Sequence, residues 1–157
     1  MWLQEVEKLH LDSIQMSDPS ASGDMLSPEM FDEFAGPYIR RAFEGLEDTK
    51  KVLHICGNMA GMLEQMISTH AEGLSLEEKT DPYKAVEIVN GRAALIGNVG
   101  VVMPLLQGKP EDVRAAALRS ADAGFNIINA GCGLSAMIPK QNIVAMVEAI
   151  KAMTPRK

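Results

Sequence analysis

The sequence predicts an α/β protein with a parallel sheet, because short apolar runs alternate with longer helical patterns and each run is followed by turn-forming residues. The five runs that have the composition of strands are residues 11–16, 51–56, 73–76, 93–97 and 125–129. Repeated βα units of this length favour a parallel sheet, and residues that perform chemistry then lie at the carboxyl ends of the strands.

The first helical pattern follows residues 11–16 and their turn. Ser27 is a suitable capping residue, and Pro28 suits the first position of a helix. An apolar stripe continues the pattern past Pro37, and it consists of Met30, Phe31, Phe34 and Tyr38. We therefore expect one helix here that packs through this stripe.

Two further helices are expected in the second half of the chain. The first opens at Pro110, and Gly124 has the position of a C′ residue that ends it. The second runs from Gln141 to Ala152. Its apolar side consists of Ile143, Val144, Val147 and Ile150.

Composition and charge exclude several classes of protein. A formal net charge of −6 and a pI of about 5.1, with the 15 Lys and Arg residues scattered, argue against a nucleic-acid or anionic-membrane surface. With 46% hydrophobic residues the chain can bury one core, so we expect a single domain over residues 1–157. Residues 1–20 lack the apolar core of a signal peptide, and no apolar run is long enough for a membrane span. We therefore expect a cytoplasmic protein.

His54, Cys56 and Cys132 are the candidate metal ligands. Side chains at i and i+2 of a strand point the same way, so His54 and Cys56 can converge on one ion. Two thiolates and an imidazole suit a catalytic zinc site with an open fourth position. Two alternatives remain: buried free cysteines that act as small hydrophobes, and a disulfide between the only two cysteines. A cytosolic compartment disfavours the disulfide.

Four segments of the chain resemble the uroporphyrinogen decarboxylase-like superfamily. They are residues 18–28 (DPSASGDMLSP), 54–58 (HICGN), 97–98 (GN) and 131–139 (GCGLSAMIP). Within the superfamily they resemble the branch of zinc-dependent corrinoid methyltransferases, such as methylcobalamin:coenzyme M methyltransferases. The resemblance covers about residues 11–150.

The resemblance implies an activity and the residues that carry it. His54, Cys56 and Cys132 become zinc ligands, and Glu77, with Glu78 as the fallback, becomes the catalytic acidic residue that can bind the metal when no thiol is present. The implied reaction transfers a methyl group from a methylated corrinoid, either a corrinoid protein or free methylcobalamin, to a thiol substrate such as coenzyme M that zinc activates as a thiolate. A solvated turn is the alternative for both glutamates. Decarboxylases of the superfamily typically carry Gly-His-Gly in place of Gly-Cys-Gly, so Cys132 decides between the branches.

Further polar residues lie near the predicted strand ends. Asn58 and Asn98 each follow a glycine and are candidates for binding substrate, with a role as turn residues as the equal alternative. Asp18 and Asp24 lie in the first loop, where the resemblance implies the pocket rim, although capping or turn stabilisation is the expected role. Surface or turn positions are expected for His10, His70, Asp122 and Asn126.

The resemblance also implies a partial TIM-type β/α barrel. Barrels of this superfamily have eight strands and roughly twice this length, so five strands correspond to a carboxyl-terminal portion. Met1 to Leu9 then resemble the tail of a preceding helix. An arc of parallel strands leaves two open edges, which are templates for association. We therefore expect a homo-oligomer or a complementary amino-terminal half-barrel chain.

Two other functions stay open. A uroporphyrinogen decarboxylase would need arginines at the site, whereas Arg40, Arg41 and Arg92 do not fall at predicted strand ends. The other is a non-catalytic remnant that assembles with a full-length partner. Zinc content distinguishes the first from the methyltransferase, and solution mass with activity distinguishes the second.

Overall fold

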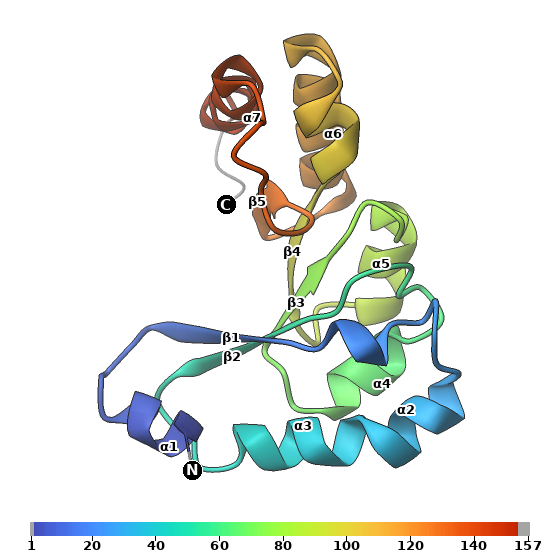
Figure 1. Ribbon diagram of the computed structural model, residues 1–157, viewed down its shortest axis with the longest axis vertical. Coiled ribbons are helices and arrows are strands. Elements are labelled where there is room, and N and C mark those ends of the chain that lie inside the picture. The colour runs from blue at the N-terminus through green and yellow to red at the C-terminus, as the bar shows by residue number, and fades with distance from the viewer. Residues whose placement is uncertain (1, 154–157) are drawn as a thin grey trace.

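The chain folds around one parallel sheet of five strands in a computed structural model that describes residues 2–153 (Figure 1). The strands are β1 (Ser13–Ser17), β2 (Lys50–His54), β3 (Gly73–Leu76), β4 (Ala94–Val99) and β5 (Ile127–Ala130). They lie in the order β1-β2-β3-β4-β5, which is the order of a barrel arc. The predicted partial TIM-type β/α barrel is therefore confirmed. Met1 and residues 154–157, which the expected domain included, lie outside the described residues.

Helices connect the strands and cover one face of the sheet. They are α1 (Trp2–Glu7), α2 (Pro28–Phe34), α3 (Gly36–Phe43), α4 (Leu63–Ser68), α5 (Pro82–Val89), α6 (Pro110–Ala123) and α7 (Lys140–Lys151). The 3₁₀ helix η1 (Pro19–Ala21) follows β1, and the π-helical segment η2 (Val101–Leu106) follows β4. Figure 1 shows α2, α3 and α4 below β1 and β2, with α6 and α7 together at the other end of the sheet.

Two strand ends near the site differ from the predicted ones: β4 continues to Val99 and so includes Asn98, and β2 ends before Cys56. β3 covers the expected residues, but β2 ends at His54, so the placement of Cys56 on a strand was wrong. His54 and Ser75 are the last paired residues of β2 and β3. The following backbone leaves the ladder and enters a turn at Gly57, whose φ of +93° favours glycine.

The predicted helix after β1 is two helices, α2 and α3, divided at Ala35. Pro37 lies in the first turn of α3, where its missing N–H does no harm. The division changes which residues face the sheet, and the expected apolar stripe was wrong apart from Phe31. Phe31, Ala35, Ile39 and Phe43 are buried, whereas Met30, Phe34 and Tyr38 are exposed.

The two carboxyl-terminal helices pack on each other through small residues. α6 begins at Pro110 as predicted, and Gly124 ends it in the left-handed conformation with φ of 117°. The buried side of α7 consists of Asn142, Ala145, Met146 and Ala149. Val144 and Val147 of the predicted apolar side are exposed, because the small side chains of α7 lie closest to the neighbouring layer.

The two faces of the sheet differ in how they are covered. Leu53, Leu74 and Leu95 point toward the helices and form the main core together with residues of α2, α3 and α4. On the opposite face Gln15, Ser17, Ile127 and Asn129 are exposed. β1 and β5 each pair with one neighbour only among the described residues, so both edges of the arc are open.

The helices of residues 2–153 include none with the length and apolar character that a bilayer crossing requires.

Candidate metal centre at the strand ends

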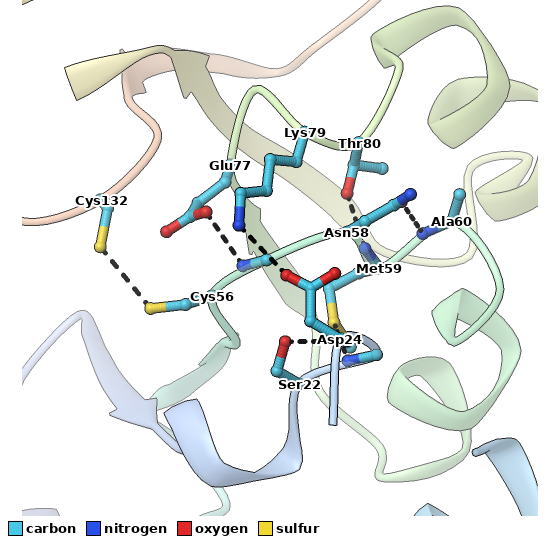
Figure 2. A network of polar contacts seen from close by, with 12 residues as sticks. Ser22, Asp24, Cys56, Asn58, Met59, Ala60, Glu77, Lys79, Thr80 and Cys132 are labelled. Atoms are coloured by element: carbon cyan, nitrogen blue, oxygen red, sulfur yellow. Dashed lines mark hydrogen bonds and ion pairs between the residues drawn. The ribbon is translucent and has the colours of Figure 1, made fainter. Parts of the chain in front are cut away.

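Three side chains meet at the carboxyl end of the sheet. His54 Nε2 lies 3.3 Å from Cys56 Sγ and 3.7 Å from Cys132 Sγ. The two sulfur atoms are 3.6 Å apart, and Figure 2 shows them facing each other. Both cysteines are free thiols, so the alternative of a disulfide is not formed. The structure therefore brings all three predicted metal ligands together.

The curvature of the arc accounts for this meeting. His54 is the last residue of β2, Cys56 lies in the loop that follows it, and Cys132 follows β5. β2 and β5 are separated by β3 and β4 in the sheet order. Residues so far apart across a flat sheet would not touch, since neighbouring strands are about 4.8 Å apart. The barrel-like curvature places the two loops within contact distance.

Ser75 orients the imidazole of His54. Nδ1 lies 3.1 Å from the carbonyl oxygen of Ser75 and 3.1 Å from its Oγ. A carbonyl oxygen only accepts, so Nδ1 carries the hydrogen and Nε2 presents its lone pair to the two sulfurs. Sequence analysis missed Ser75. Its place opposite His54 in adjacent strands is the signal that could have found it.

The Cys56 thiol is protonated at neutral pH when no cation is near. Burial, the contact with Cys132 and the charge of Glu77 together raise its pKa to about 12, with burial as the largest cause. A bound cation reverses this preference, because it stabilises the thiolate. Binding of a metal here must therefore release protons.

The donor set fits zinc. The ligand atoms of His54, Cys56 and Cys132 all lie within 4.8 Å of one another, so one ion can reach all three. Two sulfurs and one imidazole nitrogen are ligands that zinc accepts, and the hydrogen bond from Nδ1 is the usual outer support of such a histidine. Three protein ligands leave a fourth position open.

Glu77 lies beside this cluster, and a backbone hydrogen bond fixes its carboxylate. The backbone N–H of Gly57 donates to Glu77 Oε2 at 3.0 Å, and the carboxylate contacts Cys56 closely enough to influence its pKa. Figure 2 shows the Glu77 side chain beside the Cys56–Cys132 pair. Glu78, the fallback residue, is exposed and lies against Gly100 and Gly131.

Gly131 allows the β5 loop to approach Glu77. A Cβ atom at this position would lie 2.9 Å from Glu77 Cα and 3.3 Å from Glu78 N. Real Cβ atoms essentially never lie within 3.0 Å of another heavy atom, so the contact with Glu77 Cα would force the backbone to move. The glycine before Cys132 is thus a requirement of the close approach between the β5 loop and the β3 loop.

The loops after β1, β2 and β3 are tied to one another (Figure 2). Lys79 Nζ lies 3.1 Å from Asp24 Oδ2, and the N–H of Met59 donates to Thr80 Oγ1 at 2.9 Å. Asp18 caps η1 by accepting from Ser20 N at 3.2 Å. Asp18 and Asp24 therefore stabilise the first loop, as expected from the sequence.

The two candidate asparagines lie in different surroundings. Asn98 is buried in β4, where Nδ2 donates to Thr80 O at 2.8 Å and Glu77 O at 3.2 Å, and Oδ1 accepts from Ser120. Its amide supports the β3 loop from inside, a role that sequence analysis had not included. Asn58 is exposed, and its Oδ1 accepts from Ala60 N at 3.1 Å. Neither side chain lines the cavity that opens beside His54, Cys56 and Cys132, which is described next.

A cavity of about 390 Å³ opens in front of the cluster. Its walls include His54, Cys56 and Cys132, with Ser75 behind the imidazole. Uncharged polar side chains of β1 and β5 also line it, namely Gln15, Ser17 and Asn129, together with Pro19, Ala130 and Gly133. The cavity can therefore admit a small molecule to the open position of a bound metal.

The remaining candidates lie away from the cluster. His10 and His70 are exposed, as expected. Tyr83 Oη donates to Asp122 at 2.9 Å, and Asn126 Oδ1 accepts from Leu95 N at 2.8 Å. Arg40 donates to Ser68, and Arg92 pairs with Glu64. Three arginines were considered for a decarboxylase, and none of them lines the cavity beside the candidate metal ligands. They are Arg40, Arg41 and Arg92.

Comparison with known proteins decides the family. The family model described as uroporphyrinogen decarboxylase (URO-D) matches residues 3–153. The chain belongs to the URO-D family. Within this family the match is to members of two kinds, methyltransferases and decarboxylases.

The methylcobamide:CoM methyltransferases among the relatives share more identity with this chain than the uroporphyrinogen decarboxylase of Synechococcus does. The methylcobamide:CoM methyltransferase MtbA of Methanosarcina mazei is 36% identical over 142 residues, covering 89% of this chain and 42% of the relative. MtaA of Methanosarcina barkeri is 35% identical over 139 residues, with 88% and 41% covered. A uroporphyrinogen decarboxylase of Synechococcus sp. is 31% identical over 150 residues, with 91% and 41% covered.

A solved structure has the same fold. A methyltransferase from Methanosarcina mazei superposes with a TM-score of 0.85 at 32% identity, covering 94% of this chain and 46% of that chain. This chain thus spans less than half the length of the URO-D relatives that it matches.

Proposed function

We propose that this URO-D family chain forms the zinc-binding part of a methyltransferase that moves a methyl group from a methylated corrinoid to a thiol such as coenzyme M. One observation carries the proposal: His54, Cys56 and Cys132 place three zinc-compatible atoms within 4.8 Å at the mouth of a cavity. The relatives named methylcobamide:CoM methyltransferases support the choice of donor and acceptor.

Each residue of the site has a proposed role. His54, Cys56 and Cys132 hold the zinc, and Ser75 keeps the His54 lone pair directed at it. Zinc supplies a positive charge that lets a thiol lose its proton near neutral pH. Glu77 is the acidic residue that would bind the zinc when no thiol is present and that a thiol substrate would replace. The hydrogen bond from the Gly57 N–H holds its carboxylate beside Cys56.

The reaction balances without a further reagent. The thiol proton goes to solvent, and the sulfur forms a bond to the methyl carbon. The cobalt–carbon bond breaks at the same time, with both electrons remaining on the cobalt. The corrinoid is either bound to a corrinoid protein or free methylcobalamin, and in both cases it must approach from the open mouth of the cavity. We propose a cytoplasmic setting for this chemistry.

The open edges of β1 and β5 imply that the site works within a larger assembly. We propose that further strands complete the barrel, supplied by a complementary amino-terminal half-barrel or by a second copy of the chain. Exposed residues of the uncovered face, such as Gln15 and Ile127, would then become buried. Zinc binding needs only described residues, whereas methyl transfer is expected to be slow without the completing strands.

Metal analysis of the purified chain tests the zinc site. We expect about one zinc per chain, lost when Cys132→Ala removes a ligand. Met137→Ala is the matched control, because Met137 is 81% exposed in the same loop and should keep its zinc. An unchanged zinc content in Cys132→Ala would contradict the site. Absence of zinc in the unaltered chain would favour a decarboxylase.

Calorimetry tests the activation of the thiol. Binding of coenzyme M to the zinc-loaded protein should release about one proton, measured in buffers of different ionisation enthalpy. Methyl transfer from methylcobalamin is then measured with and without an added amino-terminal half-barrel. If no simple thiol binds with release of a proton, the methyltransferase proposal is rejected. The decarboxylase and the non-catalytic remnant then remain as the possible functions.

A further inference from the structure

The two cysteines of the metal cluster lie close enough to react with each other. Cys56 Sγ is 3.6 Å from Cys132 Sγ, both are free thiols, and Figure 2 shows the two sulfur atoms facing each other. A disulfide bond measures about 2.05 Å, so a small shift of the side chains closes the gap. The sequence holds only these two cysteines, so each is the one possible disulfide partner of the other within the chain.

Backbone hydrogen bonds next to each cysteine hold the sulfur atoms in these positions. After Cys56, the N–H of Gly57 donates to Glu77 Oε2 at 3.0 Å. Before Cys132, the N–H of Gly131 donates to the carbonyl oxygen of the last residue of β4 at 2.8 Å. The fold has thus already met the entropic cost of bringing together two residues that are 76 positions apart in the sequence. A bond within one chain therefore forms in preference to a bond between two chains.

A small reagent can reach both cysteines from solvent. Each is partly exposed, and both line the cavity of about 390 Å³. Of the described residues that line this cavity, none is Lys, Arg, Asp or Glu, so an uncharged reagent enters without desolvating a charged side chain. Two thiols become a disulfide only when an oxidant takes up two electrons, and a small organic disulfide is an uncharged oxidant of suitable size.

We propose that the metal-free chain exchanges with small organic disulfides, and that the reversible Cys56–Cys132 disulfide so formed prevents metal binding. In the first step one cysteine sulfur attacks the small disulfide, forms a mixed disulfide and releases one small thiol. In the second step the other cysteine sulfur attacks the mixed disulfide, forms the Cys56–Cys132 bond and releases the second small thiol. The two cysteines lose two electrons and two protons, and the two released thiols carry both.

The exchange prevents metal binding because it uses two of the three ligands. A thiolate binds metal, so oxidation of Cys56 and Cys132 leaves only His54 of the cluster. An excess of small thiol reverses both steps and restores the ligands. Disulfides of cytosolic proteins are usually transient and respond to redox conditions, which agrees with a reversible bond at this position. The effect on zinc rests on the proposed function, whereas the exchange itself does not.

Intact mass and thiol counts of the metal-free chain test the exchange. The reduced, chelator-treated chain is incubated with bis(2-hydroxyethyl) disulfide and measured without reducing agent. The expected product is a single chain that is lighter by two hydrogen atoms and has no free thiol, and excess 2-mercaptoethanol should return it to the starting mass. Absence of reaction, a stable mixed disulfide on each cysteine, or a product that joins two chains would overturn the inference.

Single-cysteine variants should stop after the first step. Cys132→Ser and Cys56→Ser should each retain one 2-mercaptoethanol in a mixed disulfide, because no second sulfur is present to displace it. Met137→Ala is the control, since Met137 is 81% exposed in the loop of Cys132, and this variant should form the disulfide as the unaltered chain does. Loss of two hydrogen atoms in either single-cysteine variant would overturn the assignment to this pair.

Zinc release separates this inference from the proposed function. The zinc-loaded chain should react more slowly than the metal-free chain, and it should release zinc to a chelating indicator in step with the loss of thiols. A chain that binds no zinc but forms the disulfide would overturn the proposed zinc site and support the exchange. A chain that binds zinc and keeps it after the disulfide has formed would overturn the proposed effect of the exchange on metal binding.

Discussion

The Nδ1–H of His54 donates to the backbone carbonyl oxygen of Ser75 at 3.1 Å, across the last paired residues of β2 and β3. The bond fixes the imidazole from the side opposite the two sulfurs. Because the acceptor is a backbone atom, the orientation of His54 depends on the pairing of two strands more than on the side chain of Ser75. The pairing of β2 and β3 thus sets the geometry of the candidate metal site.

Ser75→Ala should therefore have a smaller effect on zinc than His54→Ala. The alanine variant keeps the carbonyl acceptor and loses only the Oγ contact. Mutation of a residue that hydrogen-bonds a metal ligand costs about 10- to 100-fold in metal affinity, and we expect a loss near the lower end of this range. His54→Ala should lose tight binding altogether. Competition with a chelating indicator measures both. Equal losses in the two variants would mean that the hydroxyl, not the carbonyl, orients His54.

Asn98→Ala should destabilise the fold, because the amide of Asn98 lies inside it. The change leaves the carbonyls of Thr80 and Glu77 without their Asn98 contacts and removes the shorter of the two contacts of Ser120 Oγ. We expect a loss of about 2–4 kcal/mol in the free energy of unfolding, measured by urea denaturation. Asn58→Ala is the control at an exposed position and should cost less than about 1 kcal/mol. Similar values for the two would contradict the structural role of Asn98.

Much of the fold was predictable because its signals are local. Alternating apolar runs and turns located all five strands, and Pro110 with Gly124 located both ends of α6. The face of α2 and α3 was not predictable from periodicity. Tyr38 belongs to the same apolar pattern as Phe31, but the division at Ala35 turns it outward. A helix break beside a proline changes the phase of the pattern, and periodicity alone does not show where the break lies.

The cluster of candidate metal ligands was predictable from residue type, spacing and family resemblance, but the residues that support it were not. Histidine and cysteine are residue types that commonly bind metals, so His54, Cys56 and Cys132 can be recognised as candidates from the sequence. Ser75 and Gly131 cannot be recognised in this way, because serine and glycine are common residues in every part of a protein. Their roles follow from contacts across strands, with Ser75 opposite His54 and Gly131 against Glu77. Asn98 looked like a residue for substrate because a strand end was expected at Gly97, whereas β4 continues to Val99.

Acid should destabilise the chain partly through Glu72. A hydrogen bond from Lys50 at 2.8 Å, with a second from the N–H of Lys51, lowers the pKa of this carboxyl below its ordinary value of 4.5. A lowered folded-state pKa gives stability that is present above pH 4.5 and is lost as the pH falls through the lowered pKa. Glu72→Gln should therefore show a flatter loss of stability below pH 4.5.

Urea denaturation at several pH values measures this dependence. Glu87→Gln, at an exposed position of α5, is the control and should follow the unaltered chain. Curves for Glu72→Gln and the unaltered chain that run parallel down to the acid limit would contradict the role of the Lys50–Glu72 pair.

Gly131→Ala should weaken zinc binding although it alters no ligand. The added Cβ would lie 2.9 Å from Glu77 Cα, and because that contact is with backbone, the loop that carries Cys132 must move away from β3. We expect at least about a tenfold loss of zinc affinity, comparable with the loss of an outer support, and about 1–3 kcal/mol of lost stability from the strain.

Gly133→Ala provides a matched control on the other side of the same cysteine. A Cβ at Gly133 meets no atom within 4 Å, so this variant should bind zinc as the unaltered chain does. Chelator competition and urea denaturation are carried out on both variants. If Gly131→Ala and Gly133→Ala bind zinc equally well, Cys132 is held by the rest of its loop, and the close approach of Gly131 to Glu77 is not what positions it.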